Sequence, residues 1–193
     1  MRYEKGRKDA SRQRIMEVAA ERFRCDGIAA TGLAKIMGEA GLTNGAFYPH
    51  FGSKAELVRE SIAAALEEQS ELLKGLVADG GLETALSAYL SPAHRDDPGH
   101  GCALAALLPE LAREPFRTRH FYGEQFLETV RTLSEALPRR KRDPEGTAIA
   151  IYALLIGALQ LARATEGTVL SDRILAAAAD AARALANKGQ NKR

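Results

Sequence analysis

Apolar residues recur at helical spacing along nearly the whole chain, with polar residues on the opposite faces. Caps and glycines divide this pattern into segments, the first beginning near Asp9 and ending at Gly27. The predicted helical segments are 9–27, 31–40, 43–50, 53–78, 82–90, 102–111, 115–137, 143–165 and 171–187. The pattern therefore predicts an all-α fold of about nine helices without a strand.

The residues at the segment ends support these boundaries. Ser53 precedes Glu56 by three positions, which is the spacing of a capping box. Asp143 places a capping side chain directly before a proline that suits the first helical turn. The stretch 91–101 is rich in Pro, Asp and Gly, so we expect a loop there.

The composition of the chain fits a soluble helical protein. Its 193 residues are 46% hydrophobic and only 6% aromatic, which suits one or two helical domains. The two cysteines, Cys25 and Cys102, exclude a disulfide scaffold and favour a reduced compartment. The longest apolar run, 148–159, is shorter than the roughly 20 residues of a membrane span, and no secretory signal is evident. We therefore expect a cytoplasmic protein with no membrane partner.

The net charge of +2 is unevenly distributed along the sequence. Residues 1–14 hold six basic and two acidic side chains, which gives +4 and leaves −2 for the remainder. A basic N-terminal arm predicts a polyanionic partner, although solvated basic tails are also common.

Residues 31–54, TGLAKIMGEAGLTNGAFYPHFGSK, have the pattern of a helix-turn-helix. Two short segments with inward apolar residues flank Gly41, which a sharp turn requires. Phe47 is expected in the core. The outer rim then holds four side chains that can contact bases or phosphates, namely Thr43, Asn44, Tyr48 and His50. In the alternative interpretation, Tyr48 and His50 fill the core and Thr43 only caps a helix.

Further residues are suited to contact the phosphates of a nucleic acid. Thr31 is expected at a helix N-terminus, where backbone amides favour anions. Lys54 opens the next helix, and Arg7 and Lys8 belong to the basic arm. These cations could position the protein on a duplex without reading its sequence.

The turn Gly41-Leu42-Thr43, followed by Gly45-Ala46-Phe47-Tyr48-x-His50-Phe51-x-Ser53-Lys54, resembles the TetR (tetracycline-repressor-like) transcriptional regulators. The resemblance covers about residues 9–60. It implies a helix-turn-helix DNA-binding domain at 1–52 and a helical ligand-binding and dimerisation domain at 53–193. It also implies a homodimer on double-stranded operator DNA that an unidentified small-molecule effector releases. By motif position, Thr43, Tyr48, His50 and Lys54 would contact DNA, with Thr31 on a phosphate.

The later helices supply candidates for a ligand pocket and a dimer face. Seven residues could line an apolar pocket with a few polar groups: Cys102, Leu107, Phe121, Tyr122, Phe126, Tyr152 and Gln160. Small and apolar residues along 149–160 and 174–185 suit a four-helix interface between two copies. Both sets could instead form the core of one copy.

Motifs of other functional classes are lacking, so we predict no enzyme, no cofactor and no metal site. A phosphate-binding glycine loop, a nucleophile elbow and an HExxH motif do not occur. The cluster His94, Asp96, Asp97, His100 and Cys102 is interpreted as a solvated loop, since it lacks a recognisable ligand spacing. The leading hypothesis is a ligand-released repressor of a palindromic operator. The alternative is a DNA-binding activator or architectural protein without a ligand.

Overall fold

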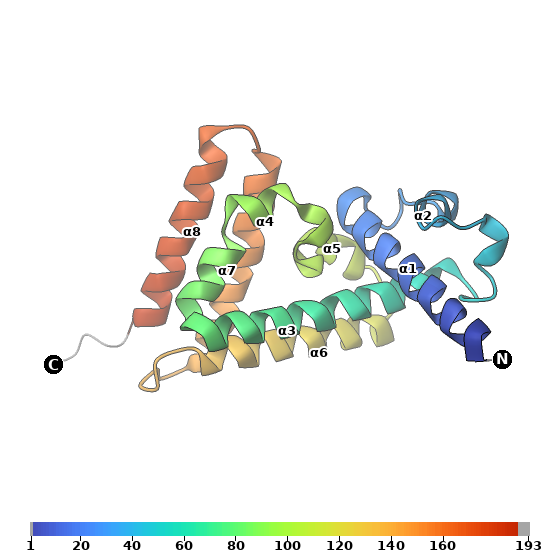
Figure 1. Cartoon of the computed structure of the whole chain (residues 1–193). Helices are drawn as coiled ribbons and strands as arrows, with labels where there is room; N and C mark the ends of the chain where they lie inside the picture. The colour runs from blue at the N-terminus through green and yellow to red at the C-terminus, as the bar shows by residue number, and fades with distance from the viewer. Residues whose placement is uncertain (1, 189–193) are drawn as a thin grey trace. The chain divides into compact units, whose positions relative to one another are not determined.

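The computed structural model describes residues 2–188, and these residues are all-helical (Figure 1). The all-α prediction is confirmed: the described residues form eight α-helices and contain no strand. The helices are α1 (Arg2–Asp26), α2 (Leu33–Glu39), α3 (Lys54–Tyr89), α4 (Pro92–Asp96), α5 (Ala103–Leu111), α6 (Phe116–Glu135), α7 (Pro144–Ala164) and α8 (Val169–Asn187). Two short 3-10 segments, η1 (Asn44–Ala46) and η2 (Pro98–His100), lie between them.

The chain forms two compact units. The first, which we call the head, contains the residues up to Leu66 together with Pro98–Thr118. The second, which we call the body, contains Glu67–Asp97 and the residues from Arg119 onward. The head is therefore discontinuous in sequence, because η2 and α5 return to pack against α1.

Several predicted helix ends are confirmed. Ser53 Oγ accepts a hydrogen bond from the Glu56 amide at 3.1 Å, and the Glu56 carboxylate accepts from the Gly52 amide at 2.8 Å. Asp143 likewise caps α7 by accepting from the Gly146 amide at 2.9 Å. Within α3 the helical backbone is interrupted at residues 80–81, where the two glycines leave helical φ and ψ.

Other predicted boundaries are wrong, each for a local reason. The first helix begins at Arg2, not Asp9, because the Arg, Lys and Glu residues before Asp9 favour helix and outweigh the single glycine at position 6. The side chains of Arg2 and Lys5, counted in the basic arm, lie outside the described residues. The second helix follows Gly32, since Thr31 turns its hydroxyl inward and donates to the Gly27 carbonyl at 2.7 Å.

The stretch expected as a loop contains α4 and η2. Ser91 accepts from the His94 amide at 3.1 Å and Pro92 occupies the first turn, so a cap and a proline together open a short helix. The last helix begins at Val169, two residues before the predicted Ser171 cap. Ser171 is instead buried and donates to the carbonyl of residue 162 at 2.7 Å.

The core of the head joins α1, α2, η1 and the start of α3. The apolar faces predicted for the first two helices are largely buried, including Phe23 and Met37, which are fully enclosed. The other fully buried large side chains of this unit are Ile15, Ile36, Phe47, Phe51, Leu57, Ile62 and Leu107. The helix-turn-helix thus has a complete apolar support that leaves its polar rim outside.

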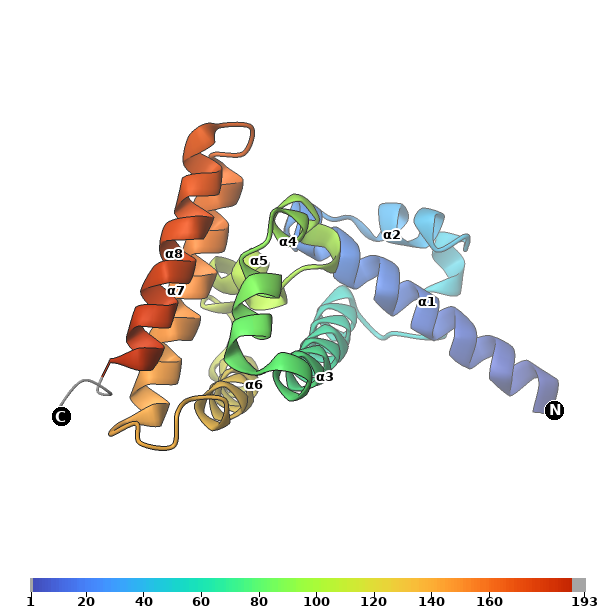
Figure 2. The same cartoon turned by 60° about the vertical axis from the view of Figure 1, so that its left-hand side comes forward.

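In the body, α7 and α8 pack along their lengths as an antiparallel pair (Figure 2). At one end Lys141 donates to the carbonyls of Ala186 at 3.2 Å and Lys188 at 2.8 Å, which ties the α6–α7 loop to the end of α8. At the other end Arg163 donates to the carbonyls of His94 and Arg95, at 2.9 and 3.0 Å, and so holds α4.

The helix α7 is longer than the apolar run at residues 148–159. The helix extends beyond its apolar run to 21 residues, so by length and composition alone it could cross a membrane. Ile151, Leu155 and Leu159 are among its buried residues, although only 39% of its apolar window is buried, and a single helix of this kind is weak evidence for a membrane span.

Candidate nucleic-acid interface

The turn after α2 has the geometry expected of a helix-turn-helix. Gly41 has a φ of +73°, a conformation that a side chain would oppose. The Leu42 amide donates to the Met37 carbonyl at 2.8 Å, and the Gly41 amide donates to the Gly38 carbonyl at 3.0 Å. This bonding closes the end of α2 and redirects the chain, as the sequence predicted.

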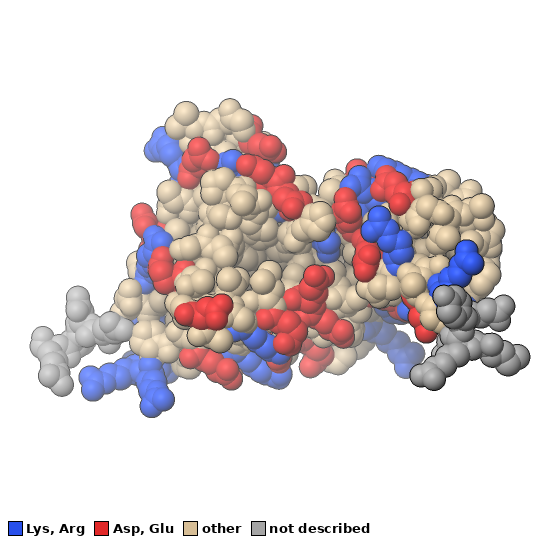
Figure 3. Space-filling view, in the orientation of Figure 1, with Lys and Arg blue, Asp and Glu red and all other residues tan. Residues whose placement is uncertain are grey.

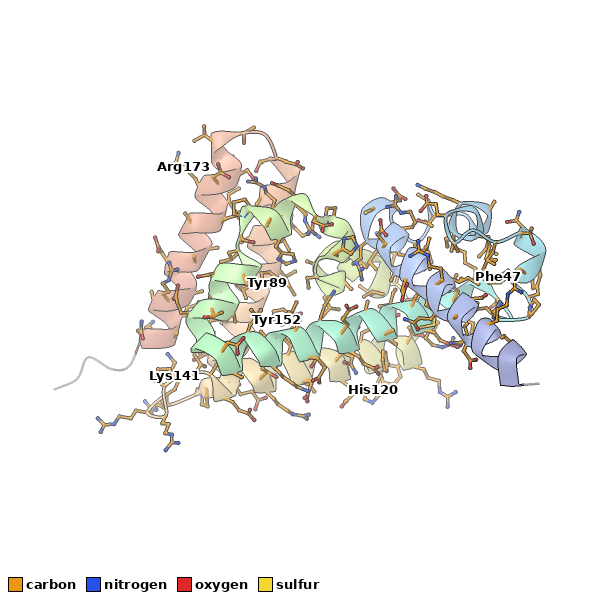
Figure 4. All side chains as sticks on the ribbon, viewed as in Figure 1. Phe47, Tyr89, His120, Lys141, Tyr152 and Arg173 are labelled. Atoms are coloured by element: carbon orange, nitrogen blue, oxygen red, sulfur yellow. The ribbon has the colours of Figure 1, made fainter. Side chains whose placement is uncertain are left out.

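The segment expected as a second helix is a single 3-10 turn. Thr43 precedes it, and the Ala46 amide donates to the Thr43 carbonyl at 2.9 Å. Gly45 weakens helix formation, and Pro49 lacks the amide that a further turn would need. Phe47 anchors the turn in the core with only 1% of its surface exposed (Figure 4).

The rim of this turn offers uncharged polar groups to solvent. Thr43, Asn44 and Tyr48 are exposed, and Tyr48 keeps 71% of its surface accessible. The Tyr48 ring stands edge-on to Phe47, with 5.4 Å between the ring centroids. Figure 3 shows this part of the head largely without charged side chains. A hydroxyl, an amide and a phenol therefore point outward from a fixed backbone.

His50 is half-buried beside the basic side of α1. Its Nδ1 has no hydrogen-bond partner among the described residues. Burial lowers the pKa of the imidazole, and the positive charges of Lys8 and Arg12 lower it further. The ring is therefore neutral near pH 7, so it can offer a hydrogen bond but not a charge.

Arg7 and Lys8 are exposed on the first turns of α1, where the sequence placed the basic arm. Arg12, one turn after Lys8, lies over the Phe51 ring at 4.7 Å and forms an ion pair with Glu60. This cation was counted in the arm but not predicted as a link between helices, because its partners are distant in sequence. It holds the arm against the start of α3.

The other two predicted phosphate contacts lie deeper in the head. Lys54 is half-buried, and its Nζ donates to the Ile28 carbonyl at 2.7 Å. Thr31 is fully buried, and its hydroxyl is used inside the head. The side chain of Thr31 is therefore not on the surface, and we leave it out of the contacts proposed below.

The ligand-pocket candidates fall into both units. In the body, Phe126 stacks on Tyr152 with 5.3 Å between ring centroids, and Phe121 meets Tyr122 edge-on at 5.6 Å. Gln160 is half-buried on α7. In the head, Cys102 and Leu107 are buried at the start of α5 and within it, and the Cys102 Sγ accepts from the Ala105 amide at 3.4 Å. Their role towards a ligand stays a prediction.

The side chains of the 94–102 cluster have protein partners. His94 Nδ1 bonds the Tyr89 carbonyl at 2.7 Å, and Asp96 pairs with Arg95 at 2.5 Å. Across the described part of the chain, no group of three or more His, Cys, Asp or Glu side chains is arranged to hold a metal ion.

Comparison with known proteins places this geometry in a family. The model of the family described as "Bacterial regulatory proteins, tetR family" matches residues 15–61. The probable HTH-type transcriptional regulator ArpR of Pseudomonas putida is 37% identical over 73 residues, which are 38% of this chain and 35% of ArpR. The HTH-type transcriptional regulator TtgR, also from Pseudomonas putida, is 41% identical over 64 residues, which are 33% of this chain and 30% of TtgR. The matched stretch thus spans about a third of each relative.

Solved structures extend the similarity of fold over the whole chain. A TetR transcriptional regulator from Chloroflexus aurantiacus has a TM-score of 0.80 at 23% identity, covering 100% of this chain and 98% of that one. A TetR-family regulator from Cytophaga hutchinsonii has a TM-score of 0.78 at 24% identity, covering 97% and 98%. The reduced form of Escherichia coli NemR has a TM-score of 0.73 at 19% identity, covering 88% and 95%.

The capped α2, the glycine turn and the exposed rim define a helix-turn-helix protein. The match over residues 15–61 and the two Pseudomonas putida relatives show that this helix-turn-helix segment is similar to that of the TetR family of bacterial regulatory proteins. The solved structures show that the whole chain shares their all-helical fold.

Proposed function

We propose that this protein is a DNA-binding transcriptional regulator, and that residues 1–52 form its DNA-binding domain. The observation that carries the proposal is the contrast between neighbouring residues of one turn. Phe47 is buried while Thr43, Asn44 and Tyr48 are exposed, so one anchored side chain holds hydrogen-bonding groups outward. Such a rim suits base edges in the major groove.

The basic arm and the uncharged rim have different roles in DNA binding. Arg7 and Lys8 supply exposed positive charge that attracts phosphates regardless of sequence. Lys54 adds a cation at the start of α3, and neutral His50 offers a hydrogen bond near the arm. Discrimination between sequences then depends on the uncharged rim, because phosphate contacts position a protein without reading bases.

We propose further that two copies associate through α7 and α8, within a second domain at 53–193. Exposed apolar residues follow the outer side of this pair, including Ile149 and Leu161, which are 38% and 59% exposed. Ala153, Ala177 and Ala181 are exposed as well and allow helix axes to approach closely. A twofold dimer would bind a palindromic operator.

Repression, and release by a small molecule, complete the proposal. Apolar and aromatic residues in the body, among them the stacked Phe126 and Tyr152, are the kind of lining that small ligands use. The burial of α7 residues supports a soluble protein, and we propose a cytoplasmic location. A DNA-binding activator or architectural protein would share the rim and would differ only in its response to ligand.

Genomic fragments captured by the purified protein at about 150 mM salt test the DNA-binding proposal, because non-specific binding is weak there. We expect one enriched palindromic motif for the wild-type protein and loss of enrichment for Tyr48→Ala. Capture of fragments without a shared motif would overturn sequence-specific binding. A small-molecule screen by thermal shift, repeated on the DNA complex, separates a ligand-released repressor from a protein that has no ligand.

The dimer is tested separately by sedimentation. Ala153→Glu places a charge on the proposed face and should yield monomers, whereas Ala176→Glu, at an exposed position on a different side of α8, should not. A wild-type monomer at micromolar concentration would contradict the proposed dimer.

A further inference from the structure

Glu110, on α5, holds the backbone of the turn that joins α1 to α2. Its Oε2 accepts from the Ile28 amide and its Oε1 from the Ala29 amide, both at 3.1 Å. One carboxylate therefore binds two successive backbone amides, and each bond is strengthened by the charge. Gly27 has a φ of +85°, and a Cβ there would lie 3.6 Å from both carboxylate oxygens. A Cβ would therefore make only ordinary van der Waals contact with Glu110, and it is the positive φ that favours glycine here.

The same turn supports a residue that we propose to contact DNA. Lys54 Nζ donates to the Ile28 carbonyl at 2.7 Å. Ile28 is thus held at its amide by Glu110 and at its carbonyl by Lys54. Thr31 adds a bond from its hydroxyl to the Gly27 carbonyl at 2.7 Å. Three elements, α5, α3 and the residue before the α2 cap, fix the entry to the helix-turn-helix.

We propose that Glu110 is a positioning residue for DNA binding. It fixes the α1–α2 turn, and through Ile28 it sets the place of Lys54 and the start of α2. The inference rests on the proposed function, since it concerns affinity for an operator. It also gives a reason for the discontinuous head: α5 lies far along the sequence but completes the support of the DNA-reading part.

Whether replacing Glu110 strengthens or weakens DNA binding distinguishes a positioning role from a purely electrostatic one. Replacing Glu110 with glutamine raises the net charge from +2 to +3, because one acidic residue of the 25 is lost. Attraction to phosphate alone would then strengthen DNA binding. A positioning role predicts weaker binding, because the amide side chain has only one acceptor oxygen for the two backbone donors.

The test compares Glu110→Gln and Glu110→Ala with the wild-type chain and a matched control. Glu114→Gln removes an equal charge from a carboxylate that is likewise half-buried but does not bind the α1–α2 turn. Two quantities are measured: the hydrogen-exchange rates of the Ile28 and Ala29 amides by NMR, and the affinity for the captured operator at about 150 mM salt. Thermal denaturation establishes that each variant is folded.

We expect both Glu110 variants to exchange the two amides about tenfold faster and to bind the operator about tenfold more weakly, which corresponds to the loss of about one charge-assisted bond. Glu114→Gln should match the wild type in amide exchange and bind the operator as tightly as the wild type or more tightly, because it raises the net charge without touching the turn. Unchanged or tighter operator binding by Glu110→Gln overturns the positioning role, even if exchange is faster. If Glu110→Ala does not fold, the isosteric glutamine variant decides. If the wild-type chain itself binds no operator, the result contradicts the proposed DNA-binding function and not the positioning role of Glu110 alone.

Discussion

The exposed turn at residues 43–48, which we call the reading turn, holds two adjacent aromatic residues, Phe47 and Tyr48. Truncation of Phe47 should mainly lower the stability of the protein, whereas truncation of Tyr48 should mainly lower its affinity for DNA. Phe47 is 1% exposed and contacts both Tyr48 and Phe51, whose ring centroids lie 5.4 and 5.6 Å away. Phe47→Ala leaves a cavity in the head, at a cost of about 3–5 kcal/mol. Because a domain of this size is stable by only about 5–15 kcal/mol, this loss brings the protein close to unfolding.

Tyr48→Ala should cost much less stability. With 71% of its surface exposed, Tyr48 buries about three tenths of the roughly 200 Å² of an aromatic side chain. At about 25 cal/mol per Å² this area corresponds to roughly 1.5 kcal/mol. Its affinity for the operator should nevertheless fall about tenfold or more, since a base contact is worth about 1–3 kcal/mol.

Urea denaturation gives the free energies of unfolding, and fluorescence anisotropy with the captured operator gives the affinities. Tyr48→Phe, which keeps the ring and loses the hydroxyl, shows whether the phenol oxygen carries the contact. The reasoning is refuted if Tyr48→Ala destabilises the protein as much as Phe47→Ala does. Full operator affinity in Tyr48→Ala would remove this residue from the proposed interface.

Three further predictions concern a buried hydrogen bond, a histidine pKa and the backbone conformation of two glycines. Ser171→Ala should lower the free energy of unfolding by about 1–3 kcal/mol in a urea titration, because it breaks a buried 2.7 Å bond, whereas the exposed Thr168→Ala should change it by less than about 1 kcal/mol. Burial lowers the pKa of His94 from its ordinary 6.5, so the unfolded chain binds a proton first as the pH falls. Stability should therefore decline below about pH 6.5, and His94→Gln should reduce this decline in denaturation series at several pH values; an unaltered slope contradicts the assignment. Gly38→Ala should stabilise α2 by up to about 1 kcal/mol in thermal scans, while Gly41→Ala, at a φ of +73°, should cost about 1–2 kcal/mol; the reverse order would refute the backbone argument.

The sequence predicted the helices well where local chemistry determines them. The capping pairs at Ser53 and Asp143 form as expected, and Gly41 has the positive φ that its place in the turn required. Apolar periodicity also predicted the buried face of α1. Each of these features depends on residues within about one helical turn of one another, so it can be derived from a short window of sequence.

Features that depend on distant contacts could not be predicted in this way. Thr31 has the sequence context of a helix cap, but its hydroxyl donates to the carbonyl of Gly27, the residue that follows α1. The segment 43–50 has helical spacing, yet Phe47 packs into the core from a single 3-10 turn. Glu110 lies 82 residues from Ile28, and no local pattern connects them. The residues that support the reading turn are therefore less evident in sequence than the residues that form its rim.

In the head, the positive charge and the uncharged polar groups lie on different elements. Arg7 and Lys8 are exposed on α1, while the reading turn presents neutral groups. Binding driven by the arm should weaken steeply with salt, whereas discrimination between sequences by the rim should persist. Salt titrations on operator and random DNA would measure the two contributions separately.

Footprinting of the wild-type protein on the captured DNA tests the central claim most directly. We predict two symmetric protected half-sites, separated by about one helical turn or a multiple of it, and we predict that Tyr48→Ala needs at least about tenfold more protein for the same protection. Protection without symmetry, or protection that Tyr48→Ala leaves unchanged, would contradict the proposal that a dimer reads DNA through this turn.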